Sequence, residues 1–186
     1  MKVFFLASPS KINIYKLNYQ KIAELIKKLG HEHTCQFIIN FNKSFFNLPK
    51  SEWSKHYQTV INSLLVSDVA VFDITVSSLA IGQLLQYALI NGKPVIALHT
   101  KAYNPIFLSG ATDSESKLQF LEYSLENIDS VLKEALVYAQ EWLESRFTLI
   151  LTPSIKGYLD KMNQKGVSRS EYIRQLIIKD MKEEKI

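Results

Sequence analysis

The chain has 186 residues, of which 47% are hydrophobic and 22% are charged, with only six glycines and five prolines. This composition excludes disordered and collagen-like chains and leaves room for one α/β domain with a small appendage. The apolar run at residues 3–8 is too short for a signal peptide or a membrane span, so we expect a cytoplasmic protein with no membrane partner.

The expected elements of residues 1–145 alternate between apolar β-branched runs and helical patterns. This alternation is typical of a parallel sheet with helices on both faces, and we expect a five-stranded α/β fold of the flavodoxin or Rossmann type. The expected strands are Lys2–Ala7, Thr34–Ile39, Val69–Asp73, Pro94–Leu98 and Leu118–Glu122. The expected helices are Tyr15–Leu29, one that follows Pro49, Leu79–Ile90 and about Leu125–Ser145. The inner face of the second helix is expected to include Trp53, Tyr57 and Leu65.

The period of the pattern changes at Arg146. Alternation over residues 146–152 predicts one strand, which Pro153 ends, and two short amphipathic helices follow it. The second helix opens at the capping box Ser168–Glu171. One strand and two helices cannot bury their apolar residues alone, so we expect the chain to form a homodimer through residues 146–186.

The net charge of +4 is confined to this C-terminal segment. Residues 146–186 hold nine of the 22 Lys and Arg residues but only five of the 18 acids, so the remainder of the chain is neutral. A basic segment favours a polyanionic partner, although the interspersed acids also fit an ordinary solvated surface.

The order strand, helix, helix, with Ser168–Glu171 before Tyr172-Ile173-Arg174, resembles the ribbon-helix-helix family of bacterial DNA-binding proteins. The resemblance implies that two chains pair their strands and that the ribbon enters the major groove of double-stranded DNA. The residues that would face the bases are Arg146, Thr148 and Ile150. Ile150 offers no hydrogen bond, so direct readout would rest on the other two. The residues that would grip a phosphate are Ser168, Arg169 and Ser170. Alternatively, the ribbon only dimerises the protein.

Three segments of the N-terminal region carry a second resemblance. Ser67–Thr75, the stretch from Gly82 to Leu89, and Gly92–Leu98 resemble the nucleoside 2-deoxyribosyltransferases and the related deoxynucleoside-monophosphate N-glycosidases, over about residues 1–145. In those enzymes the nucleophile is a glutamate in a Gly-x-Glu-Leu-Gly turn, which attacks the anomeric carbon of the sugar.

The chain departs from that pattern at four positions. Leu84 stands at the position of the nucleophile, and Ser78 stands where an acid six residues earlier is usual. An acid of the preceding helix falls near Val60, and the tyrosine of the first strand matches Phe4. Because an isobutyl group cannot act as a nucleophile, we assign no catalytic residue and expect a pocket that holds a nucleoside or nucleotide without cleaving it.

Ligands lodge at the carboxyl ends of the strands in open α/β sheets. Asp73 ends a strand there and would contact a ribose or a base, or it only caps the following turn with Thr75. The expected ligand-binding residues are Phe4, Ser8, Asp73, Ser78, Gly82 and His99. We expect no cofactor, and no metal, because His31, His33 and Cys35 lack a nearby fourth ligand.

Together these patterns predict a non-catalytic, dimeric, DNA-binding regulator whose N-terminal domain, residues 1–145, binds a nucleoside, a nucleotide or a protein partner. The alternative is an active deoxyribosyltransferase or N-glycosidase that uses a relocated acid such as Asp73, with residues 146–186 serving only assembly. A third possibility is a scaffold that binds neither a small molecule nor DNA.

Overall fold

The computed structural model describes residues 1–102, 117–144, 150–164 and 169–183. The chain divides into two compact units, Met1–Arg146 and Phe147–Ile186. The elements of the first unit are β1 (Lys2–Ala7), the 3-10 turn η1 (Pro9–Lys11), α1 (Ile12–Lys28), β2 (Glu32–His33), the 3-10 turn η2 (Lys43–Asn47), α2 (Lys50–Leu65), β3 (Val69–Asp73), α3 (Leu79–Ile90), β4 (Val95–His99), β5 (Leu118–Glu122) and α5 (Ile128–Glu144). The second unit contains α6 (Pro153–Gln164) and α7 (Arg169–Glu183).

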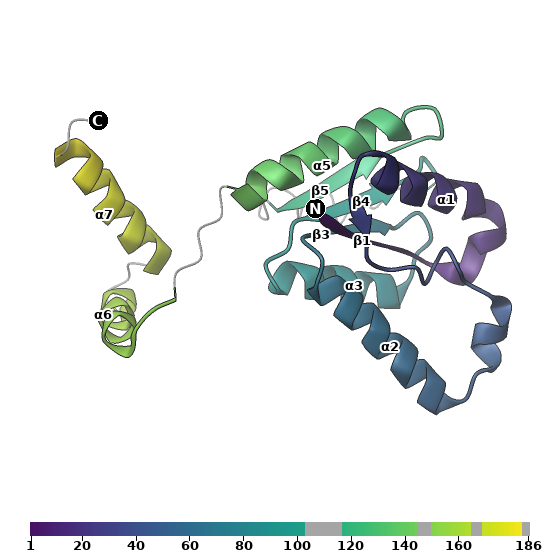
Figure 1. Ribbon diagram of the computed structural model, residues 1–186, viewed down its shortest axis with the longest axis horizontal. Coiled ribbons are helices and arrows are strands. Elements are labelled where there is room, and N and C mark those ends of the chain that lie inside the picture. Colours follow the sequence, from purple (N-terminus) through teal and green to yellow (C-terminus); the bar gives the residue numbers. More distant parts are fainter. Residues whose placement is uncertain (103–116, 145–149, 165–168, 184–186) are drawn as a thin grey trace. The chain divides into compact units, whose positions relative to one another are not determined.

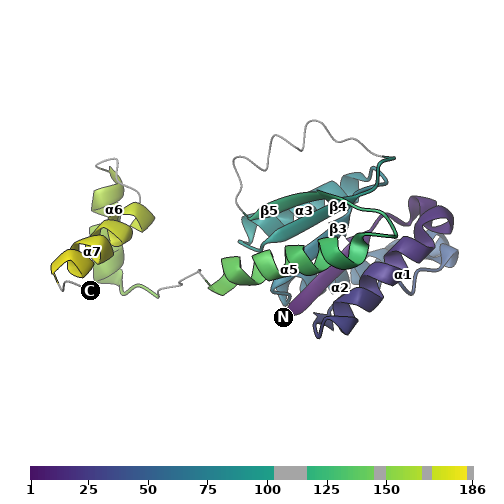
Figure 2. The same ribbon diagram turned by 90° about the horizontal axis from the view of Figure 1, so that it is seen from above.

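The first unit is a three-layer α/β fold (Figures 1 and 2). Its five parallel strands lie in the order β2-β1-β3-β4-β5, with α1 and α5 on one face of the sheet and α2 and α3 on the other. This doubly wound topology confirms the expected fold class. The strand order reverses between β1 and β3, and the carboxyl ends of these two strands therefore mark the crevice where such sheets bind ligands.

The local sequence explains most of these elements. Every residue of β3 and β4 is buried, as expected for strands covered on both faces. Tyr19, Ile22 and Ile26 lie one turn apart on α1 and are buried against the sheet. Gly30 follows α1 with a φ of 82°, the left-handed conformation that glycine adopts readily at the end of a helix. The side chain of Ser78 caps α3.

The second strand was expected at Thr34–Ile39, but β2 covers only Glu32–His33. The chain leaves the sheet after one last ladder bond, from Thr34 N to the carbonyl oxygen of Val3, 3.0 Å away. Cys35 and Ile38 are nevertheless buried. The apolar pattern of this segment therefore reflects packing of a loop, which the sequence alone does not distinguish from a short strand.

The inner face predicted for α2 was partly wrong. Trp53 and Tyr57 are 44% and 50% exposed, Leu65 is also exposed, and α2 buries only Val60, Ile61 and Leu64. The physical reason is that the first half of α2 packs against the η2 segment, where the indole Nε1 of Trp53 donates a hydrogen bond to the carbonyl oxygen of Phe45 (3.0 Å). The helical spacing of the aromatic residues was right, but their burial was not.

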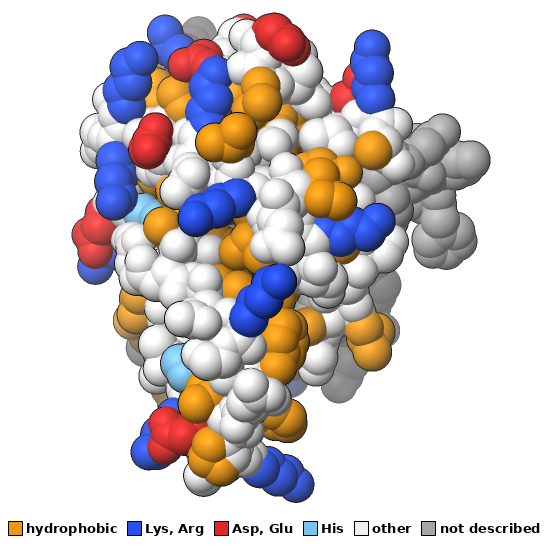
Figure 3. Space-filling view, turned by 90° about the vertical axis from the view of Figure 1, so that its right-hand side faces the viewer, with side chains coloured by type: hydrophobic (Ala, Val, Ile, Leu, Met, Phe, Trp, Pro, Cys, Tyr) orange, Lys and Arg blue, Asp and Glu red, His pale blue; other side chains and the backbone are white. Residues whose placement is uncertain are grey.

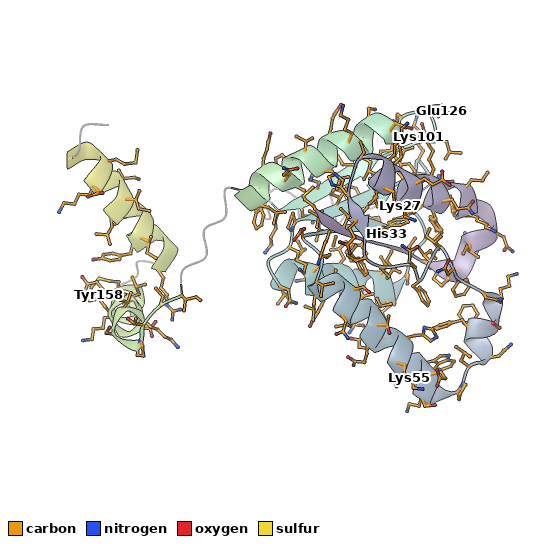
Figure 4. All side chains as sticks on the ribbon, in the orientation of Figure 1. Lys27, His33, Lys55, Lys101, Glu126 and Tyr158 are labelled. Carbon is orange, nitrogen blue, oxygen red and sulfur yellow. The ribbon has the colours of Figure 1, made fainter. Side chains whose placement is uncertain are left out.

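In the second unit, α6 and α7 pack against each other. The hydroxyl groups of Tyr158, labelled in Figure 4, and Tyr172 are 2.9 Å apart. Among the described residues of this unit, Leu159 is the one hydrophobic residue that is buried. Residues 146–149 of the predicted strand lie outside the described residues, and residues 150–152 are not in a strand. Because a ribbon would form only between two copies, the strand stays a prediction.

No helix within the described ranges is both long and apolar enough to cross a membrane.

Candidate functional site

A buried polar network lies at the carboxyl edge of the sheet, where the strand order reverses. Asp73 ends β3 beside Ala7 of β1 and is fully buried. Its Oδ1 atom accepts a hydrogen bond from the backbone N–H of Thr75 (2.9 Å), and its Oδ2 atom accepts one from the hydroxyl of Tyr123. The Nδ2 atom of Asn18, on α1, donates to the same hydroxyl at 3.2 Å. The network therefore ties the ends of β3 and β5 to α1.

The electrostatics of this network raise the pKa values of both Asp73 and Tyr123. Burial raises the pKa of Asp73, while hydrogen bonds from Tyr123 and Thr75 partly offset that rise. Burial and the negative charge of Asp73 raise the pKa of Tyr123 far above its usual range. Tyr123 is thus a permanent donor to the carboxylate. The turn-capping alternative for Asp73 is the arrangement observed, and both carboxylate oxygens are occupied within the protein.

His99 ends the neighbouring strand β4. Its ring stacks on Phe120 with centroids 4.6 Å apart and planes 21° apart, so the imidazole is largely buried. The next residue, Thr100, donates its backbone N–H to the Oγ1 atom of Thr75 (3.0 Å). The Oγ1 atom of Thr100 itself is buried and has no hydrogen-bond partner among the described residues. An orphaned buried hydroxyl is uncommon, and it is a group that a bound ligand can satisfy.

Ser8 follows β1 at the same edge of the sheet and is also buried. Its side chain caps η1 by accepting from the backbone N–H of Ser10 (3.4 Å), and its carbonyl oxygen accepts from the hydroxyl of Tyr19 (3.3 Å). The pKa of Tyr19 is raised by burial and then by the charge of Asp73. The structure thus brings Ser8 and Asp73 to adjacent strand ends, although neither exposes a free polar group.

Three of the four positions that depart from the pattern of the resembled enzymes lie in the core or at the start of α3. Phe4 is fully buried, and its ring packs on Phe72 with centroids 5.6 Å apart. Leu84 is 7% exposed and belongs to the hydrophobic core. The Oγ atom of Ser78 accepts a hydrogen bond from Ile81 N at 3.4 Å. Phe4 and Leu84 therefore contribute to packing, and little or none of their surface is exposed.

Gly82 lies on the exposed side of α3, and no heavy atom lies within 4 Å of where a Cβ would stand. It is separated from the buried side of the helix, where Leu84 packs.

The sequence did not reveal a cavity of about 520 Å³ between the loop that follows β2 and the helix α2. Its lining residues are Thr34, Cys35, Gln36, Phe37, Asn40, Phe41, Asn42, Ser44, Phe45, Leu48, His56, Thr59, Val60 and Ser63. Val60, the position of an acid in the resembled enzymes, is among them. Among the residues that the structure describes, no Asp, Glu, Lys or Arg side chain lines this cavity.

Aromatic rings form one wall of the cavity. The ring of Phe45 lies edge-on to Phe37 and to His56, with centroids 5.1 and 5.2 Å apart. The signal that points to it in the sequence is the run of aromatic residues 37, 41, 45 and 46, which suits neither a strand nor a helix of the sheet. A pocket of this size with aromatic walls and a few amide and hydroxyl groups has the usual character of a small-molecule site.

Two smaller cavities, of about 320 and 260 Å³, lie around the beginning of α1. Lys43 and Phe41 line both, and Lys16 lines the larger one. The larger one also shares Asn42 with the 520 Å³ cavity. None of these three cavities is lined by Asp73 or His99, and none has a carboxylate in its wall.

The predicted DNA contacts are only partly within the described residues. Arg146, Thr148 and Ser168 lie outside them, and Ser170 is the second residue of α7. Ile150 is almost fully exposed. Arg169 forms an ion pair with Asp160 of α6, so its guanidinium is engaged within the unit.

Within the described ranges, no group of three or more His, Cys, Asp or Glu residues is arranged to hold a metal ion.

No protein-family model matches the sequence, and no curated protein matches it. Among solved structures, the fold is similar to that of the CMP N-glycosidase BcmB of Clostridium botulinum, with a TM-score of 0.52 and 16% sequence identity. The likeness covers 74% of this chain and 99% of that protein. At this identity the comparison establishes a shared α/β fold, of the kind that the resemblance to nucleoside-processing enzymes predicts.

Proposed function

We propose that the N-terminal unit binds a nucleoside or a nucleotide without cleaving its glycosidic bond. The observation that carries this proposal is Leu84, which stands where the resembled enzymes have their nucleophile and packs into the hydrophobic core. The similarity in fold to a CMP N-glycosidase supports the ligand class. The resembled enzymes have a tyrosine at the position of Phe4 and an acid near the position of Val60. The apolar side chains of these two residues therefore support the loss of glycosidase activity.

The rival, an active enzyme with a relocated acid, is less well supported. Cleavage requires a carboxylate that reaches the anomeric carbon. Asp73 is fully buried with both oxygens hydrogen-bonded, and the walls of the three cavities contain no carboxylate. Among the described residues, a substrate in any of these cavities would meet no carboxylate nucleophile.

The chemistry of the cavities suits the parts of a nucleotide. The 520 Å³ cavity offers aromatic rings for stacking on a base and the side-chain amides of Gln36, Asn40 and Asn42 for its polar edge. The adjoining 320 Å³ cavity presents Lys16 and Lys43, whose charges favour a phosphate. We infer that the base occupies the uncharged cavity and that any phosphate lies toward the lysines.

For the second unit we propose dimerisation and binding to double-stranded DNA, as the ribbon-helix-helix resemblance implies. The supporting observation is the number of exposed apolar side chains on such short helices, namely Ile155 and Tyr158 on α6 and Leu176, Ile177, Ile178 and Met181 on α7. Burying them against a second copy would offset the small core of one copy. The surplus of positive charge in residues 146–186 supports a polyanionic partner.

Two assays test these proposals. Incubation of the full chain with deoxynucleosides and their monophosphates, followed by chromatography, should yield no free base above the level without protein; release of base would support the active enzyme instead. Gel shifts with short duplexes over a salt series should show binding that weakens steeply with salt. Absence of binding at low salt would restrict the second unit to dimerisation.

A further inference from the structure

Positive charge is concentrated at the beginning of the first unit. Residues 1–50 contain eight Lys and two acids, whereas residues 51–145 contain five Lys and eleven acids. The two parts cancel, so the neutral sum of residues 1–145 conceals a basic segment that includes η1, α1 and η2. Figure 3 views the side of the molecule where the beginning of α1 and η2 lie, and Lys and Arg side chains are spread across it among hydrophobic ones. This side therefore attracts anions.

Three lysines of this segment lie exposed around the two smaller cavities. Lys43 lines both cavities, Lys11 lines the one of 260 Å³, and Lys16 lines the one of 320 Å³. Within the described ranges, none of the three forms an ion pair or a side-chain hydrogen bond. By contrast, Lys21 of α1 pairs with Asp129 at 2.8 Å. Ammonium groups gathered in this way repel one another, so a bound anion would stabilise them.

Aromatic rings lie among these lysines. Phe46 lines the 260 Å³ cavity and is 56% exposed, and the centroid of its ring is 5.6 Å from that of Phe41. Phe41 lines all three cavities, which adjoin one another through shared residues. An inorganic phosphate or a run of acidic residues would engage the lysines but would leave the exposed ring of Phe46 in water. The base of a nucleic acid can engage this ring by stacking on it.

This surface extends beyond one nucleotide. The proposed function already places a base in the 520 Å³ cavity and a phosphate toward Lys16 and Lys43. Lys11 and Phe46 add a further cation and a further ring around the 260 Å³ cavity. Rings and cations along adjoining cavities are typical of a single-strand site, where bases stack on aromatic side chains and the backbone follows positive charge. The stacked, paired bases of a duplex offer no free faces to such rings.

We propose that this surface, which we call the basic face, binds single-stranded DNA. The basic face consists of Lys11, Asn13, Lys16, Phe41, Lys43 and Phe46. The inference rests on the proposed function for the place of the first base. It extends the ligand to a strand whose next phosphate lies against Lys11 and whose next base stacks on Phe46. We take the strand to be DNA because the second unit of the same chain is proposed to bind DNA, which would raise its local concentration.

Fluorescence anisotropy of the full chain with a labelled oligothymidylate tests the basic face. Lys11→Gln with Lys43→Gln removes two phosphate contacts, so the affinity should fall about tenfold or more at low salt. The slope of log affinity against log salt should flatten by about 1.4, at about 0.7 for each contact. Lys27→Gln with Lys28→Gln, at exposed positions at the other end of α1, is the matched control and should leave the affinity nearly unchanged. Equal losses from the two double variants would overturn the proposal, because overall charge would then explain the binding.

Phe46→Leu separates the strand from the single nucleotide. Leucine keeps an apolar side chain on η2 but has no ring, so the affinity for the oligothymidylate should fall about fivefold or more. Phe46 does not line the two cavities assigned to the single nucleotide, so this variant should bind a nucleotide in equilibrium dialysis as wild type does. An unchanged affinity for the oligothymidylate would overturn the proposed strand, even where the nucleotide still binds. Binding of the oligothymidylate through the basic face without binding of any nucleotide would contradict the proposed function instead.

Two further ligands test the choice of single-stranded DNA. A duplex of the same length, held by the second unit, should bind equally well to wild type and to the variant with Lys11→Gln and Lys43→Gln. An equal loss of affinity for duplex and single strand in this variant would overturn the preference for single strands. Tighter binding of oligouridylate than of oligothymidylate would overturn the choice of DNA.

Discussion

The hydroxyl of Tyr123 donates a hydrogen bond to the carboxylate of Asp73, fifty residues earlier in the chain, and both side chains are buried. This contact joins the ends of β3 and β5, on either side of β4, at the edge where the fold binds ligands. Together with the hydrogen bond from Thr75, it occupies both oxygens of the Asp73 carboxylate. The following predictions test the role of this network and of the residues around it.

Tyr123→Phe should destabilise the fold. The substitution removes the donor to a buried carboxylate and the acceptor of Asn18 Nδ2, so the free energy of unfolding should fall by about 1–3 kcal/mol. Urea denaturation followed by circular dichroism measures this. Tyr57→Phe, at an exposed position on α2, is the control and should change stability by less than about 0.5 kcal/mol. Equal changes in the free energy of unfolding for the two substitutions would show that the Tyr123 hydroxyl does not stabilise the fold.

The raised pKa of Asp73 predicts a particular dependence of stability on pH. With the folded pKa above the ordinary value of 3.8, the folded state binds the proton more tightly than the unfolded state. Stability from this group is therefore present at low pH and is lost as the pH rises from about 3.8 through the folded pKa. The difference in unfolding free energy between wild type and Asp73→Asn should thus fall with rising pH. A difference that grows with rising pH would mean that the pKa is lowered instead.

Leu84→Glu should not create an enzyme. It restores the carboxylate of the resembled family but places it within the core, so both lost packing and charge burial should lower the unfolding free energy by about 3 kcal/mol or more. Leu84→Met, which conserves volume, should cost less than about 1.5 kcal/mol. Denaturation and a base-release assay on both variants provide the check. A stable Leu84→Glu protein that releases base would mean that this position faces a substrate.

Arg146→Ala should weaken binding to DNA and leave the dimer intact. If this side chain reads a base edge, its loss should cost about 1–3 kcal/mol, or roughly a tenfold to hundredfold loss of affinity. Gel shifts measure the affinity, and sedimentation equilibrium measures the mass. Lys133→Ala, on the exposed side of α5, is the control. If Arg146→Ala and Lys133→Ala bind duplex DNA as tightly as wild type, the proposed base readout is wrong.

The fold could be predicted from the sequence where local patterns and burial coincide. The strands β3 and β5 and the helix α3 have the predicted bounds because each is a short run between clear turn signals. The same reasoning failed at residues 34–39, where an apolar loop follows β2. It also failed at Trp53, because helical spacing does not show how far α2 extends beyond the sheet.

The candidate site was less predictable for a different reason. The position of Asp73 at a strand end followed from the sequence, but its partners Tyr123 and Asn18 come from distant elements that only the topology brings together. The cavity beside Val60 depends on a loop whose course has no regular period. Packing of residues far apart in sequence therefore sets the site, whereas local periodicity sets the elements.

The most direct test of the account is equilibrium dialysis of labelled nucleosides and nucleotides against the full chain, followed by chromatography of the bound fraction. The account predicts that at least one ligand is enriched on the protein side and is recovered intact. It also predicts that Thr59→Trp, which places a bulky indole ring at the cavity, abolishes this enrichment. Asn62→Trp, on the same helix but not among the lining residues, should leave the enrichment unchanged. Recovery of free base, or no enrichment of any ligand with the wild-type protein, would contradict it.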